Sequence, residues 1–168
     1  MESDSQLENY YSTKPALRDI SELISKRYKV GSNLESEIKL AENVQYSPQT
    51  VRESLIILES FGFVEITPRL NTKLISCPQS SAPSCPDSIL KKKLNVDIKF
   101  KNFVKYLRDR FKIGQKLPGQ RVLARLNVLS PDTVRTFNIR LECAGYLSMS
   151  GQGKRRTILK ELPNIYFD

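Results

Sequence analysis

The chain has 168 residues with 27 Lys and Arg, 18 Asp and Glu, and no histidine, which gives a formal net charge of +9. The lack of histidine excludes an ordinary catalytic triad and an imidazole base, and three cysteines without paired spacing offer no metal-ligand set, so we predict no catalytic residues, no metal site and no cofactor. No stretch has the roughly 18 apolar residues of a membrane span, and the polar, acidic N-terminus is no signal peptide, so we expect a cytoplasmic protein without a membrane partner.

The first half of the chain contains three predicted helices and a hairpin. Apolar residues at helical spacing predict a helix over about 15–28, and Gly31 supplies the break after it. Ser36 is a plausible cap for a short helix to about Glu42. Ser47 can cap a third helix that begins at Pro48. The hairpin strands are predicted at 63–67 and 72–75.

The second half repeats this order after a proline-rich stretch. Residues 76–88 contain three prolines and no aromatic residue, so we predict a linker that spans up to about 40 Å when extended. Helices are then predicted near 97–111, 119–126 and 131–143, and strands near 146–149 and 156–160. The fold class is therefore mostly α with small β-hairpins (α+β), as two tandem winged helix-turn-helix domains. The predicted boundaries are 1–75 for domain 1 with a polar N-terminal tail, 76–88 for the linker and 89–168 for domain 2.

A direct repeat supports two domains of one kind. Residues 27–64 laid over 110–147, a shift of 83 positions without a gap, give 15 identities in 38 positions. A period of this length is too long for a solenoid unit and suits a small domain.

The positive charge lies almost entirely in the second copy. Residues 1–80 carry 9 Lys and Arg against 11 Asp and Glu, a net charge of −2, whereas residues 81–168 carry 18 against 7, a net charge of +11. A charge excess of this size on one small domain implies a polyanionic partner.

The repeated motifs resemble the DNA-binding domain of the GntR family of bacterial transcription regulators. In the first copy they stand as Gly31, Leu34-Glu-Ser-Glu37, Leu40-Ala41, Ser47-Pro-Gln-Thr-Val-Arg52, Leu58-Glu59 and Gly62. In the second copy they stand as Gly114, Leu117-Pro-Gly-Gln120, Leu123-Ala124, Ser130-Pro-Asp-Thr-Val-Arg135, Leu141-Glu142 and Gly145. The resemblance implies a recognition helix that enters the DNA major groove and a wing that contacts the backbone.

The chain departs from the family pattern at several positions. Pro48 and Pro131 stand where members usually place Arg after the capping Ser. In the second copy Asn127 and Asn138 occupy positions that are usually apolar, and we expect Phe137 to fill the core there. A second DNA-binding-like domain stands where such regulators carry an effector-binding or aminotransferase-like domain.

The candidate DNA-binding residues come mainly from the second copy. Arg135 is the preferred base or phosphate contact, because its guanidinium suits guanine edges and phosphates alike. Pairing with nearby acids is the alternative for Arg135 and Arg52. The full candidate set is Arg121, Ser130, Asp132, Thr133, Arg135, Thr136, Arg140, Lys154, Arg155 and Arg156 in domain 2, with Gln49, Thr50 and Arg52 in domain 1.

These patterns predict a sequence-specific double-stranded DNA-binding transcription regulator that lacks an effector-binding domain and lies with the bacterial nucleoid. Two alternatives stay open: a plasmid- or phage-type replication initiator, and a winged-helix protein-interaction scaffold. The acidic balance of domain 1 also leaves open whether that domain contacts a second DNA half-site, forms a homodimer or binds a protein partner.

Overall fold

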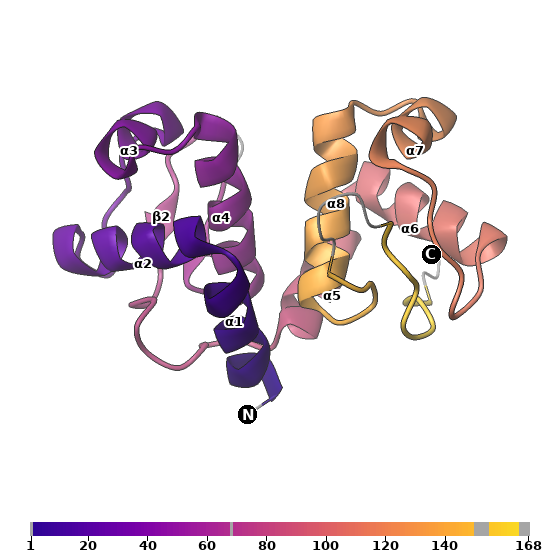
Figure 1. The fold of residues 1–168 in the computed structure, drawn as a ribbon, viewed down its shortest axis with the longest axis horizontal. Coiled ribbons are helices and arrows are strands. Elements are labelled where there is room, and N and C mark those ends of the chain that lie inside the picture. Colours follow the sequence, from indigo (N-terminus) through magenta and orange to yellow (C-terminus); the bar gives the residue numbers. More distant parts are fainter. Residues whose placement is uncertain (1, 68, 150–154, 165–168) are drawn as a thin grey trace. The chain divides into compact units, whose positions relative to one another are not determined.

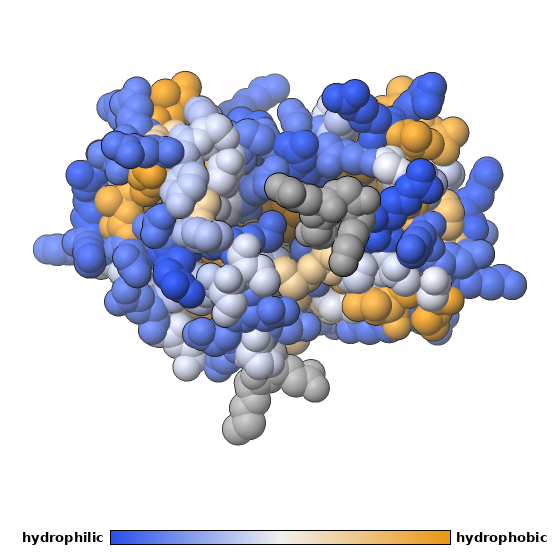
Figure 2. Space-filling view, in the orientation of Figure 1, coloured by the Kyte–Doolittle hydropathy of each residue, from blue (hydrophilic) through white to orange (hydrophobic). Residues whose placement is uncertain are grey.

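The computed structural model describes residues 2–67, 69–149 and 155–164 and divides the chain into two compact units, Met1–Ile89 (unit 1) and Leu90–Asp168 (unit 2). The described residues are mostly helical with one small antiparallel sheet (Figure 1). Figure 2 shows that hydrophilic side chains cover most of the visible face of each unit.

Unit 1 contains a winged helix-turn-helix. Its elements are α1 (Glu2–Thr13), α2 (Pro15–Arg27), α3 (Glu37–Val44), α4 (Pro48–Ser60), β1 (Val64–Glu65) and β2 (Lys73–Leu74). The two strands pair antiparallel with Val64 opposite Leu74, and both are shorter than predicted. As expected, Ser47 caps α4, accepting a hydrogen bond of 3.2 Å from the amide of Thr50, and Pro48 occupies the first turn, where no amide donor is needed.

The N-terminal residues form a helix, not the polar tail predicted from their composition. On α1, Leu7 and Tyr10 are 4% and 3% exposed, and the Tyr10 ring packs edge-on against Phe61 with centroids 6.2 Å apart. Two apolar residues three apart cover less than one helical turn, so periodicity alone could not separate this helix from a solvated tail. Packing on the rest of unit 1 therefore decides that α1 forms.

The predicted linker is partly ordered against unit 1. Pro78 is buried and accepts a hydrogen bond of 3.1 Å from the Tyr11 hydroxyl, and the Ala82 amide donates to Asp4 at 3.1 Å. The last part of the segment is helical, because α5 (Pro86–Val96) begins inside it. Proline-rich composition excludes a core but does not exclude docking on one.

Unit 2 is built from the same kinds of element. Helix α5 is followed by α6 (Ile98–Arg110), α7 (Gln120–Asn127) and α8 (Pro131–Cys143). In place of the predicted strands, the described residues form single bridges, Leu147 with Ile158 and Lys116 with Thr157. Leu90 and Leu94 of α5 join the core of unit 2, a helix that the sequence patterns did not predict.

The backbone contacts of unit 2 recur at fixed offsets from those of unit 1. The amide of Gly31 donates to Leu74 at 2.8 Å, and the amide of Gly114 donates to Ile158 at 2.7 Å. The donors are 83 positions apart and the acceptors 84, so one residue is added between the bridged segments of unit 2. Gly31 and Gly114 both have positive φ, +92° and +88°, which a side chain would strain.

A cluster of three phenylalanine rings lies in the core of unit 2. Phe137 is 3% exposed, as expected, and stacks on Phe100 at 4.6 Å and lies 5.5 Å from Phe103 between ring centroids. In unit 1 the position of Phe137 is held by Ser54, whose hydroxyl bonds its own helix at Thr50.

Candidate nucleic-acid interface

The first turn of α8 presents a row of small polar side chains. Ser130 caps the helix, accepting a hydrogen bond of 3.1 Å from the amide of Thr133, and the two hydroxyls are 2.8 Å apart. The Asp132 side chain is 62% exposed, and its backbone carbonyl accepts from the Thr136 hydroxyl at 3.1 Å. Ser130 and Thr136 thus have local structural roles in addition to any contact with a ligand.

Arg135 is held by a neutral amide from the preceding helix. Its Nε donates to Gln120 Oε1 at 3.3 Å, while Gln120 Nε2 donates to the Pro131 carbonyl at 2.7 Å. A second, longer contact joins Arg135 Nη1 to Asp132 Oδ1 at 3.8 Å, with the arginine side chain 33% exposed. The amide partner carries no charge, and the carboxylate partner is 62% exposed and beyond hydrogen-bond distance, so its hold on the guanidinium is weak.

The matching arginine of unit 1 is neutralised. Arg52 donates through Nε at 3.0 Å and through Nη2 at 2.9 Å to the same carboxylate oxygen of Glu37. Glu37 lies 83 positions before Gln120, and Gln49 lies 83 positions before Asp132. The carboxylate therefore comes from the preceding helix in unit 1, at 2.9 Å, and from the same helix in unit 2, at 3.8 Å. Beside Arg52, the Gln49 amide reaches the Glu53 carboxylate at 3.5 Å, and the Thr50 hydroxyl lies 2.9 Å from Ser47.

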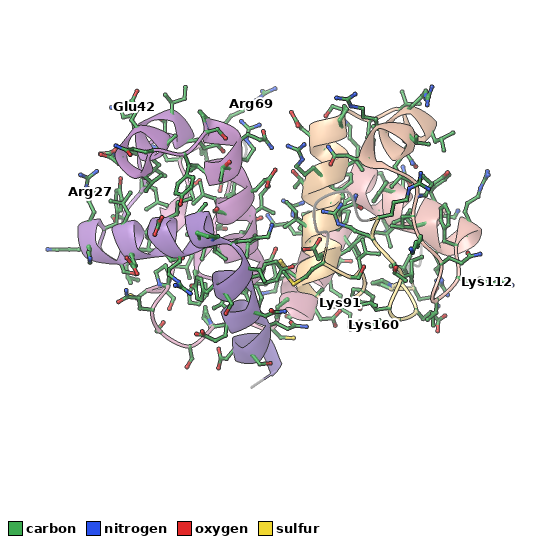
Figure 3. All side chains as sticks on the ribbon, viewed as in Figure 1. Arg27, Glu42, Arg69, Lys91, Lys112 and Lys160 are labelled. Carbon is green, nitrogen blue, oxygen red and sulfur yellow. The ribbon has the colours of Figure 1, made fainter. Side chains whose placement is uncertain are left out.

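The helix before the candidate recognition helix differs in charge between the units. In unit 2, Arg121 and Arg125 of α7 are both exposed. The equivalent positions of α3 are Ile38 and Glu42 (Figure 3). Sequence inspection named Arg121 and missed Arg125, although its position one helical turn further along the same face was a usable signal. Helices α7 and α8 together carry four Lys and Arg against two acids, and α3 and α4 carry two against four.

The two described wing arginines have different environments. Arg155 is exposed. Arg156 is 15% exposed, and its Nε donates to Glu142 Oε2 at 2.8 Å, with that carboxylate 3% exposed. Arg156 therefore ties its segment to α8, and the DNA contact predicted for it stays a prediction. Lys154 lies outside the described residues.

Arg140 also lies away from the first turn of α8. It is half-buried, with its guanidinium carbon 5.7 Å from the centre of the Phe100 ring. Its position corresponds to Ile57 in unit 1, which is 1% exposed. The side chain thus covers the aromatic core as a cation over a ring face, and the DNA contact predicted for it stays a prediction.

The cysteine and carboxylate side chains of the described residues are dispersed. Among those residues no three His, Cys, Asp or Glu side chains gather where they could hold a metal ion. Cys77, Cys85 and Cys143 are free thiols, of which Cys143 is buried. No helix within the described ranges is both long and apolar enough to cross a membrane.

Comparison with known proteins finds a family model that is similar to part of unit 1. Residues 16–73 match the family model of the bacterial regulatory proteins of the gntR family. The matched segment runs from α2 to the first residue of β2, inside unit 1. No curated protein and no solved structure matched the chain. The match supports a DNA-binding transcription regulator and fits a protein that is not an enzyme.

Proposed function

We propose that this protein is a sequence-specific double-stranded DNA-binding transcription regulator in which both units are winged helix-turn-helix domains. Unit 2 makes the principal DNA contact, through the first turn of α8 and the exposed arginines of α7. In these 168 residues, unit 2 occupies the place after the first domain where related regulators carry an effector-binding domain. A position on the bacterial nucleoid is part of the same proposal.

The recurrence of backbone contacts supports the assignment of unit 2 as a second winged helix. The Leu34 amide donates to Thr72 at 2.7 Å, and the Leu117 amide donates to Arg156 at 2.8 Å. These bonds attach the segment before the helix-turn-helix to the returning wing strand in each unit. Such long-range bonds depend on the tertiary fold, so their recurrence is stronger support than a shared helix order.

The observation that carries the DNA-binding assignment is the difference in the partners of the two equivalent arginines. Arg135 contacts the Gln120 amide and, at 3.8 Å, the Asp132 carboxylate, which is 62% exposed and can yield to a phosphate or a guanine edge. Gln120 orients the guanidinium without cancelling its charge, and Arg121 and Arg125 add exposed positive charge on the neighbouring helix. A helix N-terminus and nearby arginines together suit a DNA backbone.

The experiment is selection of bound sequences from a random duplex pool with the full chain, followed by affinity measurements on the selected motif. We expect Arg135→Ala to lower the affinity by about 1–3 kcal/mol and to relax sequence preference at one position. We expect binding to weaken steeply with salt, as phosphate neutralisation requires. Unchanged affinity and preference in this variant would remove Arg135 from the interface.

A second role for unit 1 is favoured by the Arg52–Glu37 pair. With its arginine neutralised and a net charge of −2 on α3 and α4, unit 1 suits a protein surface or a second copy of the chain better than DNA. Arg52→Ala is the matched control for Arg135→Ala, and we expect it to leave DNA affinity unchanged. An equal loss of affinity in both variants would show instead that both units contact DNA.

A further inference from the structure

Most of the positive charge of unit 2 lies away from its helix-turn-helix. Helices α5 and α6 together carry eight Lys and Arg against two acids, a net charge of +6, whereas α7 and α8 carry a net charge of +2. The core of unit 2 does not require these cations, because Phe100, Phe103 and Leu107 form the buried face of α6. The charge on α5 and α6 therefore needs a separate explanation.

Three of these cations form a stripe along α6. Lys101, Lys105 and Arg108 are four and three residues apart, so they share one side of the helix. The stripe is about 10 Å long at 1.5 Å per residue. Lys99 and Arg110, by contrast, fall on the other side of the buried face.

The stripe borders a groove. One cavity of about 750 Å³ is lined by Lys91, Lys101 and Arg108 with Tyr146. A second cavity of about 400 Å³ is lined by Arg108 and Lys112. The two cavities share Arg108, Glu161 and Leu162, so they lie next to each other. Lys91 and Lys112 lie toward opposite ends of unit 2 (Figure 3). No residue of α7 or α8 lines either cavity.

Unit 1 has a cavity at the equivalent place with a different charge. It measures about 500 Å³ and is lined by Glu8, Arg18 and Glu22, the positions that correspond to Lys91, Lys101 and Lys105. The cavity thus belongs to the fold, and the positive charge is a property of unit 2 alone. This difference points to a ligand that is anionic and specific to unit 2.

We propose that the groove and the α6 stripe bind the phosphate backbone of a duplex DNA segment other than the one contacted by α8. A backbone carries one charge per about 3.4 Å of axis on each strand, so it can meet a row of cations that extends over several helical turns. Lys and Arg both bind phosphates. A phosphate can displace Glu161 from its 3.7 Å ion pair with Arg108, because that glutamate is 79% exposed. The inference rests on the proposed function, because both surfaces bind DNA.

The test is a bridging assay with the full chain. A biotinylated duplex carrying the selected motif is fixed to beads and loaded with protein, and retention of a fluorescent duplex of unrelated sequence is measured. We expect the wild type to retain the second duplex and K101Q/K105Q to retain at least about tenfold less at equal protein loading. The matched control K99Q/R110Q also removes two cations from α6, and we expect it to retain the second duplex normally.

Each outcome decides a separate point. Equal retention by K101Q/K105Q and the wild type would overturn the inference, and would assign bridging to another surface or to a dimer. A wild type that loads on the first duplex but does not retain the second would also overturn it, while leaving the proposed function intact. Failure of the wild type to load on any duplex would instead refute the proposed function. Unfolding midpoints of both variants by circular dichroism check that the fold is unchanged.

Discussion

Units 1 and 2 share long-range backbone hydrogen bonds and helix caps yet differ in nearly every charge around the helix-turn-helix. Glu37 and Arg52 form an ion pair in unit 1. At the equivalent positions of unit 2, Arg135 donates a hydrogen bond to the uncharged amide of Gln120. The core differs as well, since Phe137 replaces Ser54. The shared fold therefore depends on buried apolar positions and a few backbone hydrogen bonds. The two units differ mainly in a few exposed charges, and this difference is the basis for proposing that unit 2 binds a polyanion.

The largest expected effect concerns the two cores. Phe137→Ala removes a ring that stacks on Phe100, so we expect the free energy of unfolding of unit 2 to fall by about 3–5 kcal/mol. Denaturant unfolding followed by circular dichroism measures this loss. The control is Ser54→Ala, for which we expect a change within about 1 kcal/mol, because the hydroxyl bonds only its own helix. Similar losses in both variants would show that the two cores depend on this position alike.

The next largest expected effect is a difference in stability between variants of the two wing arginines. Arg156→Ala leaves the Glu142 carboxylate buried without its 2.8 Å partner, and we expect a loss of about 2–4 kcal/mol of stability. Arg155→Ala should change stability by less than about 0.5 kcal/mol, since that residue is exposed. Thermal unfolding of both variants checks the difference. A loss of DNA affinity in Arg156→Ala without loss of stability would contradict the structural role.

A reciprocal exchange sharpens the charge comparison. Gln120→Glu should recreate in unit 2 the ion pair of unit 1, and we expect DNA affinity to fall by up to about 1–3 kcal/mol, the cost of losing one arginine contact. Glu37→Gln should raise the DNA affinity of the chain, because it frees Arg52 from a carboxylate. Fluorescence anisotropy at fixed salt measures both. If Gln120→Glu binds as tightly as the wild type, the partner of Arg135 does not control binding.

The smallest expected effect is the loss of stability on removing a helix cap, which should be equal in the two units. Ser47→Ala and Ser130→Ala each remove the hydroxyl that caps a third helix, and we expect each to cost about 1 kcal/mol. Calorimetric unfolding of the two variants makes the comparison. A cost confined to one unit would mean that the caps are not equivalent despite their matching geometry.

Sequence patterns predicted helices α2, α3, α4, α6, α7 and α8 and the two serine caps, because helical periodicity and Ser-Pro starts are local signals. They missed α1 and α5, because each helix has few apolar residues, and these are recognised as a buried face only once the helix packs on a neighbour. Among the candidate site residues, Arg121 is exposed and Arg135 is half-buried. The contacts of Arg140 and Arg156 with a ring and a buried carboxylate could not be predicted, because a linear pattern does not show which arginine meets them. The DNA contacts of all four stay predictions.

By itself the sequence determined the repeated helix-turn-helix motifs, the bias of positive charge to the second half and the positions of the glycine turns, all of which follow from local backbone preference and composition. Tertiary structure alone decided the partners of each arginine. Several of those partners come from distant segments, such as Gln120 for Arg135, Glu142 for Arg156 and Phe100 for Arg140. The electrostatic value of a charged side chain depends on what lies beside it in space, and only the packed chain fixes that.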